Sequence, residues 1–303
     1  MQKAQVKSAG MKVSVSRRVF VACNSVLMVA LILACFLPFW HMCVASVSDP
    51  NYVRMHTGLM VWPSGFNIMG YKLVLGKETI TAGFRNSLFI TVFGTAISMF
   101  ISSLGAYVLS KRNVYWNKWF MKMITVTMFI GGGLVPFYMV VNAIGLFDSL
   151  WAFIIPYCLS TWNMLVMRSS FRALPDSLEE SASIDGATDF TILFRIVVPL
   201  SLPVMAVMVL FYALSYWGSW FPGVLFIRSM GKQPLQLIMR GLLINNETTA
   251  IGTTSEMAEL SEEYYLELVK YVTIVIATAP IIIVYPFLQK YFVTGIMVGS
   301  LKE

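Results

Sequence analysis

The residues with the clearest chemical pattern lie in one short stretch, 172–190, between two long apolar runs. From Asp176 to Asp189 this stretch carries five acidic residues and no basic residue. Pro175 suits a first helical position, acids near a helix start complement the helix dipole, and Gly186 suits a sharp turn. The stretch is therefore predicted to form a short helix, a turn and a second short helix.

An apolar stripe on the first of these helices needs a cover. Leu174, Leu178 and Ala182 recur at intervals of four residues and share one face of an otherwise charged helix. The cover could be the protein itself, lipid headgroups or the groove of a partner, and lipid headgroups fit poorly because the stretch is acidic. We expect the groove of a partner protein to receive the stripe.

Catalytic and metal chemistry have little support in the sequence. The two histidines, His41 and His56, lie in no HExxH pattern, and the four cysteines have no CxxC spacing. The chain also lacks the G-x-x-x-x-G-K-[ST] loop that cradles nucleotide phosphates. We expect a non-catalytic protein that binds no metal or cofactor of its own.

The composition indicates what kind of scaffold holds the 172–190 stretch. Apolar residues make up 57% of the chain and charged residues only 12%, whereas soluble domains carry about 25% charged residues. Six runs without Asp, Glu, Lys or Arg approach or reach the roughly 20 residues that cross a bilayer. These runs are 19–40, 87–110, 123–141, 150–167, 196–217 and 271–289. The prediction is an all-α integral membrane protein with six transmembrane helices.

The charged residues outside the apolar runs indicate how the chain is oriented in the membrane. Five basic residues precede the first run, and the connection between the second and third runs is also basic, so both are expected in the cytoplasm. These residues are Lys3, Lys7, Lys12, Arg17 and Arg18 in the first group and Lys111, Arg112, Lys118 and Lys122 in the second. Six spans then place both termini in the cytoplasm. This distribution argues against nucleic acid as a partner despite the net charge of +7, and the first run is long enough to be retained rather than cleaved as a signal.

Small residues predict how the spans pack. Gly94, Ser98, Ser102 and Gly105 follow one another at spacings of three and four, which lets another helix approach closely, within the bundle or at a subunit interface. The run 131–133 consists of glycine and must break or kink the third span, either to line a pore or only for packing.

The 172–190 stretch closely resembles a known motif. Glu180-Ser181-Ala182, three residues, Gly186, nine residues, Ile196, one residue, Val198 and Pro199 match the EAA motif of ATP-binding-cassette importer permeases, E-A-A-x3-G-x9-I-x-L-P, with Ser181 and Val198 as the departures. Further similarities extend over nearly the whole chain and resemble the maltose-type permease family, most closely its aldouronate and complex-oligosaccharide subgroup. They include Trp62-Pro63, Gly131-Gly132, Gly145-Leu146 and the tail from Gln289 to Gly299.

The resemblance implies a type I importer permease fold with a cytoplasmic coupling helix. It implies one of two homologous membrane subunits in a bacterial plasma membrane, with two ATPase subunits that hold ATP and Mg, an extracytoplasmic solute-binding protein, membrane lipid around it and an oligosaccharide as cargo. The residues implied for ATPase coupling are Leu174, Leu178, Glu180, Ala182, Asp185, Gly186, Ala187 and Pro199, and the tail residues Gly295 and Gly299 are implied to contact the ATPase.

Sugar sites combine aromatic faces with amide or hydroxyl groups. Residues near the ends of the fourth and fifth runs could supply these, although aromatic residues there also form interfacial belts. They are Trp162, Asn163, Tyr212, Tyr216, Trp217 and Trp220. An importer permease for a non-sugar solute is the alternative; a secondary carrier has no intramembrane charge to use, and a membrane enzyme has no catalytic cluster.

The expected organisation has four parts. They are a cytoplasmic segment 1–18, a first helix with an extracytoplasmic segment 19–86, a permease core 87–295 that includes the coupling loop 172–190, and a cytoplasmic tail 296–303. The long connection 222–270 could contact the binding protein or fold on itself.

Overall fold

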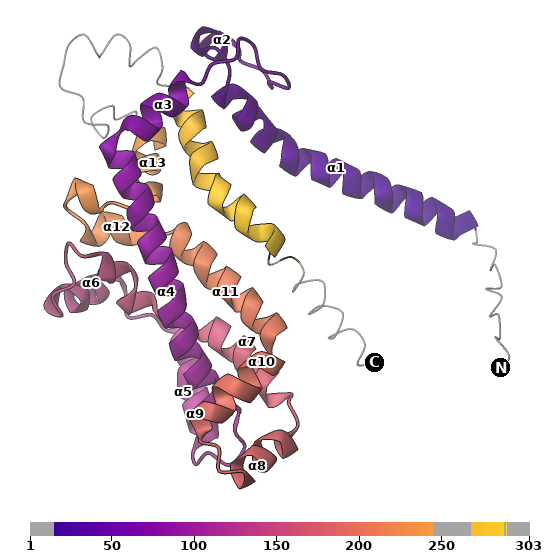
Figure 1. Ribbon diagram of the computed structural model, residues 1–303, viewed down its shortest axis with the longest axis vertical. Helices are drawn as coiled ribbons and strands as arrows, with labels where there is room; N and C mark the ends of the chain where they lie inside the picture. Colours follow the sequence, from indigo (N-terminus) through magenta and orange to yellow (C-terminus); the bar gives the residue numbers. More distant parts are fainter. Residues whose placement is uncertain (1–14, 245–267, 288, 290–303) are drawn as a thin grey trace.

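The computed structural model describes residues 15–244, 268–287 and 289, and the regular elements among them are all helical. In chain order they are α1 (Val15–Ser46), α2 (Pro50–Met55), α3 (Met69–Gly76), α4 (Glu78–Ser110), α5 (Asn117–Phe129), α6 (Leu134–Ala143), the 3-10 turns η1 (Leu150–Phe153) and η2 (Ile155–Tyr157), α7 (Thr161–Arg172), α8 (Asp176–Ile184), α9 (Asp189–Ile192), the π-helical turn η3 (Leu193–Val197), α10 (Val198–Leu200), α11 (Leu202–Trp217), α12 (Phe221–Phe226), the 3-10 turn η4 (Met230–Lys232) and α13 (Leu235–Ile244). A last helix, Leu268–Phe287, follows. Figure 1 shows α4 along the long axis, with α8 at one end and α3 at the other.

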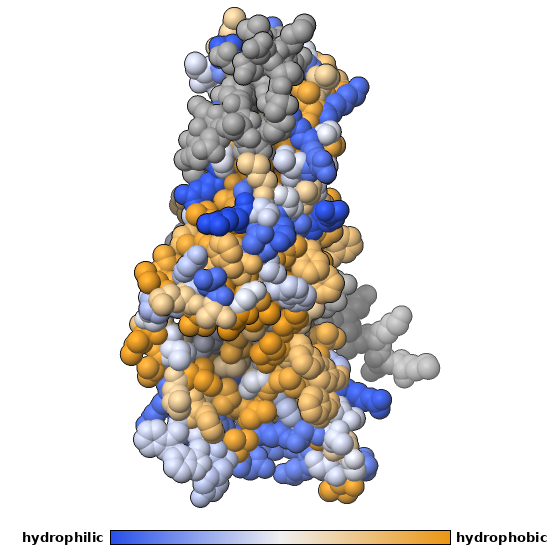
Figure 2. Space-filling model, turned by 90° about the vertical axis from the view of Figure 1, so that its left-hand side faces the viewer, coloured by the Kyte–Doolittle hydropathy of each residue, from blue (hydrophilic) through white to orange (hydrophobic). Residues whose placement is uncertain are grey.

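The lengths and apolar character of the helices suit a membrane. Three helices, Ser16–Ser46, Glu78–Ser110 and Leu268–Phe287, are long and apolar enough to cross a bilayer. Three bent pairs pass the same test if each pair is one span, which gives up to six spans among the described residues. In Figure 2 a broad apolar band separates the hydrophilic α8 end from a second hydrophilic zone higher up. The predicted six spans agree with this arrangement.

The third predicted span, 123–141, is broken at its glycines, as expected. Helices α5 and α6 meet at an angle of 111°. Gly133 precedes α6 with a φ of 82° and a ψ of 163°, a conformation that is almost restricted to glycine and costs other residues about 1–3 kcal/mol. Pro136 lies in the first turn of α6, where its missing amide hydrogen removes no helical hydrogen bond.

The fourth and fifth predicted spans are also bent, which the sequence analysis did not predict. The run 150–167 begins with two 3-10 turns and bends by 48° into α7. In the run 196–217 the bend is 91° and lies at Ser201. Pro199 and Pro203 flank this serine, and because proline has no amide hydrogen, a continuous helix could not keep its hydrogen-bond ladder here.

Close packing around α4 explains its small residues. A Cβ atom at Gly94 would lie 2.8 Å from the ring of Tyr216 in α11. The hydroxyls of Ser98 and Tyr216 lie 2.8 Å apart, and those of Ser102 and Tyr212 lie 2.6 Å apart. The predicted small-residue stripe therefore packs within the chain and lets α11 cross α4 closely.

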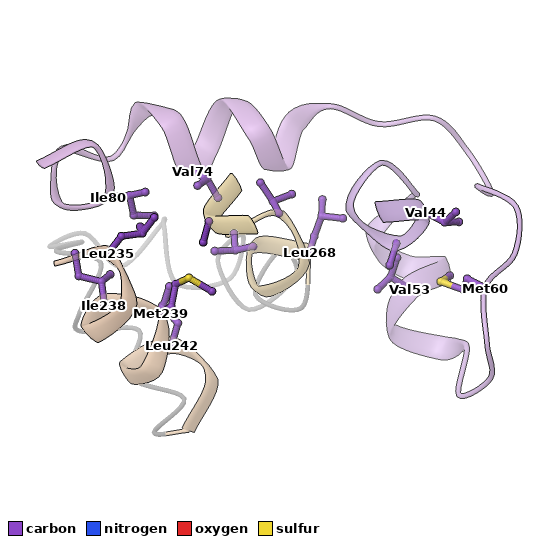
Figure 3. Packing of buried hydrophobic residues seen from close by; sticks show 14 of the residues in the cluster. Val44, Val53, Met60, Val74, Ile80, Leu235, Ile238, Met239, Leu242 and Leu268 are labelled. Carbon is purple, nitrogen blue, oxygen red and sulfur yellow. The ribbon is translucent and has the colours of Figure 1, made fainter. Parts of the chain in front are cut away.

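Two main clusters of buried apolar residues hold the ends of the bundle. The cluster at the α3 end joins the C-terminal end of α1 to α2, α3, α4, α13 and the last helix, and Figure 3 shows Leu235 and Ile238 of α13 near Ile80 of α4. The cluster at the α8 end joins α4, α7, η3 and α11 and includes Tyr107, Met167 and Leu193.

Helix α1 stands apart from the bundle (Figure 1). None of its 18-residue membrane window is buried against the rest of the chain. It is attached near its C-terminal end, where Trp40 Nε1 donates to the carbonyl of Val61 at 2.9 Å and the hydroxyls of Ser46 and Tyr71 lie 2.9 Å apart. The long apolar face of α1 is thus open to lipid or to another subunit.

Candidate functional site

The 172–190 segment forms the predicted helix, turn and helix at one end of the bundle (Figure 1). Gly186 has a φ of 81°, and the amide of Ala187 donates to the carbonyl of Ala182 at 2.9 Å to close the turn. Thr188 caps α9 by accepting the amide hydrogen of Thr191. Pro175 was predicted at the first helical position, but it is the N-cap of α8, and the first helical residue is Asp176.

The apolar stripe of this segment faces the protein itself more than expected. Leu174, Ala182 and Ala187 pack against the buried cluster at the α8 end, and only Leu178 of the predicted stripe is exposed. A repeat of four residues marks one face of a helix but does not tell which neighbour covers it.

The most exposed apolar residue of α8 was not among the predicted residues. Ile184, the last residue of α8, has 86% of its surface exposed. Two residues turn a helix by about 200°, so Ile184 lies nearly opposite Ala182. A lone isoleucine between polar residues, directly before the turn at Gly186, is the signal that could have identified it.

Lys111 connects the end of α4 to both short helices. Its ammonium hydrogen bonds with Asp189 and lies 3.8 Å from Glu179 Oε2 and 4.5 Å from the centre of the Tyr107 ring. Partial burial lowers the pKa of Lys111, but the hydrogen bond to Asp189, together with the nearby Tyr107, outweighs this and raises the pKa above its ordinary value. We call Lys111, Glu179 and Asp189 the Lys111 junction; the sequence analysis had used Lys111 only for orientation.

The remaining acids of α8 differ in their partners. Asp176 lies 3.6 Å from Arg112, with both side chains largely exposed. Glu180 and Asp185 are exposed and form no ion pair with any described residue. Glu180 also lines a polar cavity of about 230 Å³ between α8 and the end of α4. Glu180 is therefore the acid of α8 that is available to a partner.

A second cavity, of about 540 Å³, lies between η2, α7, α11 and α12. Its aromatic lining consists of Phe153, Tyr157, Phe211, Tyr212, Tyr216 and Phe221, and its polar side chains are Ser160, Asn163, Ser215 and Ser219. Of the predicted pathway residues, the fold thus brings Asn163, Tyr212 and Tyr216 together. We call this cavity the solute pocket.

The polar groups of the solute pocket are of two kinds. The hydroxyls of Tyr212 and Tyr216 already bond to serines of α4, so these tyrosines mainly fix the wall. The side chains of Asn163, Ser215 and Ser219 make no hydrogen bond within the described part of the chain. An amide and two hydroxyls beside aromatic rings could bind a polyhydroxylated ligand.

The predicted tryptophans lie elsewhere. Trp217 is buried in the cluster at the α3 end and donates its Nε1 hydrogen to the carbonyl of Ala277 at 2.9 Å, so it has a packing role. Trp162 is 61% exposed and does not line the solute pocket. Trp220 lies between two lining residues, and the guanidinium of Arg240 covers its ring.

Asp148 joins two connections that are about 80 residues apart in sequence. Its carboxylate accepts hydrogen bonds from the amides of Arg228 (3.0 Å) and Ser229 (2.9 Å) and from the Ser229 hydroxyl (2.6 Å). The ammonium of Lys232 lies 3.0 Å from the same carboxylate. Hydrogen bonds from Ser229 and then Lys232 hold the pKa of Asp148 well below its ordinary value. We call these residues the Asp148 clasp.

The remaining predicted coupling residues are Pro199 and the two glycines of the tail. Gly295 and Gly299, together with the rest of the predicted tail, lie outside the described residues. Pro199 is exposed at the bend of the fifth span. Within the described residues there is no group of three or more His, Cys, Asp or Glu side chains that could hold a metal ion.

Comparison with known proteins identifies relatives along nearly the whole chain. Residues 80–298 match the family model described as "Binding-protein-dependent transport system inner membrane component". The chain is 39% identical over 276 residues to the polygalacturonan/rhamnogalacturonan transport system permease protein YtcP of Bacillus subtilis (strain 168), covering 91% of this chain and 95% of that protein. It is 36% identical over 286 residues to protein LplC of the same organism, covering 94% and 95%.

A solved structure is similar in both sequence and fold. It is described as a bacterial ABC transporter involved in the import of the acidic polysaccharide alginate. The matched chain has 30% sequence identity and a TM-score of 0.84, and the match covers 92% of this chain and 98% of that one.

Proposed function

This chain belongs to the family of binding-protein-dependent transport system inner membrane components, and we propose that it forms half of the translocation pathway of an ATP-driven oligosaccharide importer. The observation that carries the proposal is the 172–190 segment, a short helix pair at one end of a membrane bundle, joined to α4 through Lys111. Two relatives whose names concern polysaccharides favour a sugar over another solute as cargo.

The proposed complex contains further subunits that supply functions for which this chain has no residues. Its sequence has no phosphate-binding loop, so ATP and Mg would be held by two ATPase subunits, and this chain would catalyse no reaction of its own. A second permease subunit would complete the pathway, and the open face of α1 offers it a surface. A solute-binding protein would deliver the oligosaccharide from outside the membrane.

The orientation follows from charge. Basic residues before α1 and around the end of α4 favour the cytoplasm for both, which puts the α8 end on the cytoplasmic side and both termini with it. The proposed cellular location of the protein is the inner membrane of a bacterium. The solute pocket then lies toward the outer half of the bundle, above the coupling segment.

In the proposed mechanism the coupling segment converts ATPase closure into movement of the bundle. Ile184 and, on another side of α8, Leu178 are exposed apolar residues that a groove of the ATPase could receive, and Glu180, which pairs with no described residue, could pair with a basic residue there. The Lys111 junction would carry the movement from α8 and α9 to α4. Rigid rotation of helices about α4 would then expose the solute pocket alternately to the two sides.

Replacement of Ile184 by Glu tests this mechanism directly. Burial of an isoleucine contributes about 1.5–3 kcal/mol, so affinity for the ATPase subunits should fall roughly 10-fold to 100-fold. The measurement is co-purification of the ATPase subunits together with ATP hydrolysis stimulated by the loaded binding protein. Gly186→Val, which forces a β-branched residue into a positive φ, should have a similar effect, whereas Gly186→Asn should be milder.

Ser177→Ala is the matched control, because Ser177 is exposed on the same helix and its side chain makes no hydrogen bond to a described residue. Normal ATPase binding and stimulated hydrolysis in both Ile184→Glu and Gly186→Val would refute the coupling role. If the reconstituted complex takes up a non-sugar solute but no oligosaccharide, the coupling role stands and the sugar assignment fails.

A further inference from the structure

Arg240 has a fixed position on the ring of Trp220. Its guanidinium carbon lies 3.6 Å from the centre of the ring. Arg240 belongs to α13, and Leu235 and Ile238 of the same helix are buried in the cluster at the α3 end. The negative face of an indole ring attracts a cation placed over it. Both the backbone and the side chain of Arg240 are therefore held in place.

Trp220 links Arg240 to the solute pocket. Its two neighbours in the chain, Ser219 and Phe221, both line this pocket. The ring of Phe221 meets that of Trp220 edge to face at 5.5 Å and is 42% exposed. Arg240 and Trp220 do not themselves line the pocket, but Arg240 contacts Trp220, and the residues on either side of Trp220 in the chain form one end of the pocket.

The charge of Arg240 is not neutralised by the described residues. Its guanidinium forms no ion pair with any of their carboxylates and donates no hydrogen bond to them. Lys232 differs, because it is paired with Asp148. None of the described side chains that line the solute pocket carries a charge. A cation that no described carboxylate pairs therefore contacts Trp220, next to the end of an uncharged, polar and aromatic cavity.

We propose that Arg240 is a specificity-determining residue that binds a carboxylate of an anionic oligosaccharide at this end of the pocket, an inference that rests on the function proposed above. A guanidinium presents parallel N–H donors in one plane, and these match the two oxygens of a carboxylate. A guanidinium stacked on an aromatic face keeps its N–H donors in its own plane, directed away from that ring. Phe221 and Ser219, which line this end of the pocket, would contact the sugar ring that carries the carboxylate.

The test compares trigalacturonate with its methyl ester, which has the same rings without the charge. Binding of each labelled sugar is measured by equilibrium dialysis on the purified transporter complex without the solute-binding protein, so the preference of that protein does not enter. Arg240→Gln should weaken trigalacturonate binding about tenfold, the factor for one charge-assisted contact of about 1.4 kcal/mol, and leave the ester unchanged. Arg240→Lys should retain part of the affinity, because a lysine keeps the charge but loses the paired donors.

Lys72→Gln is the matched control, since it removes one exposed positive charge from α3, outside the solute pocket. Equal affinity of the wild-type complex for both sugars, or an equal loss for both in Arg240→Gln, would overturn the proposal. Those results leave the proposed function intact as long as the complete transporter takes up an oligosaccharide in an ATP-dependent manner. Failure of that uptake with every sugar tested would refute the proposed function itself, and the role of Arg240 with it.

Discussion

At the Lys111 junction one ammonium group serves two carboxylates on two short helices, whereas at the Asp148 clasp one carboxylate receives several hydrogen bonds from a single connection. Both regions contain a lysine and an aspartate that come from distant parts of the sequence. They differ in what surrounds the pair. The junction depends on attraction between side-chain charges, while the clasp also uses backbone amides, whose positions the chain fixes.

This difference indicates where the molecule can move. Attraction between charges depends weakly on direction, so α8 and α9 can shift against α4 while Lys111 keeps both partners. Hydrogen bonds weaken steeply when their angles change, so two backbone amides on Asp148 allow little sliding. We expect the α8 end to transmit movement and the connections at the clasp to move as one body.

The largest effect is expected from exchanging the charges of the clasp. In Asp148→Lys with Lys232→Asp the amides of Arg228 and Ser229 would face an ammonium instead of an acceptor. The double variant should therefore unfold at a lower temperature in detergent and be no more stable than Asp148→Lys alone. Recovery of the wild-type midpoint by the double variant would show that the clasp is only an ion pair.

The same exchange at the junction should behave in the opposite way. Lys111→Asp puts a third carboxylate beside Glu179 and Asp189 and should lower ATP-driven uptake on the order of fivefold, as a coupling of about 1 kcal/mol would. Adding Asp189→Lys restores the pair and should recover most of the uptake, measured in proteoliposomes with all subunits. A double variant no better than Lys111→Asp would mean that the geometry, and not the charge, transmits movement.

A change of pH should affect the stability of the clasp and of the junction differently only at very low or very high pH. The lowered pKa of Asp148 means that its contribution is present above its unfolded-state pKa of about 3.9 and is lost as the pH falls through the lower native value. The raised pKa of Lys111 means that its contribution is present below about 10.4 and is lost as the pH rises through the higher native value. Hydrogen exchange corrected for its intrinsic pH dependence should show constant protection of the Ser229 amide from about pH 8 to 5. Loss of protection within this window would contradict the assignment.

The smallest effect is expected at Arg112. Its contact with Asp176 is 3.6 Å long and both side chains are largely exposed, so Arg112→Ala should cost less than about 0.5 kcal/mol. Uptake and thermal midpoint should both stay close to wild type. A loss as large as that of Lys111→Asp would show that the junction extends to the whole acidic face of α8.

Much of this architecture could be predicted from composition and spacing. The charge-free runs indicate six spans, the glycines at 131–133 indicate the break between α5 and α6, and Gly186 with its acidic neighbours indicates the helix pair. These features depend on residues close together in the chain. The bends at 150–167 and 196–217 were missed because apolar character measures only whether a segment suits lipid, and not whether it is straight.

The details of the sites depend on contacts between distant residues. The clasp joins Asp148 to residues 228–232, and the junction joins Lys111 to Glu179 and Asp189, so no local pattern predicts either. The stripe of Leu174 and Ala182 was correctly seen as apolar, but its period is the same whether the bundle or a partner covers it. Trp217 likewise lies close in sequence to the aromatic residues of the solute pocket, but the fold buries it in the cluster at the α3 end.

The separation of α1 from the bundle also bears on how the protein is made. A helix whose membrane window buries nothing against its own chain has to be stable in lipid alone. Since α1 is synthesised before α4 and α11, it can enter the bilayer and fix the topology while the packed helices are still absent. The C-terminal end of α1 then contacts Val61 and Tyr71 once these residues have been synthesised, and the rest of the bundle assembles beside a helix that is already inserted.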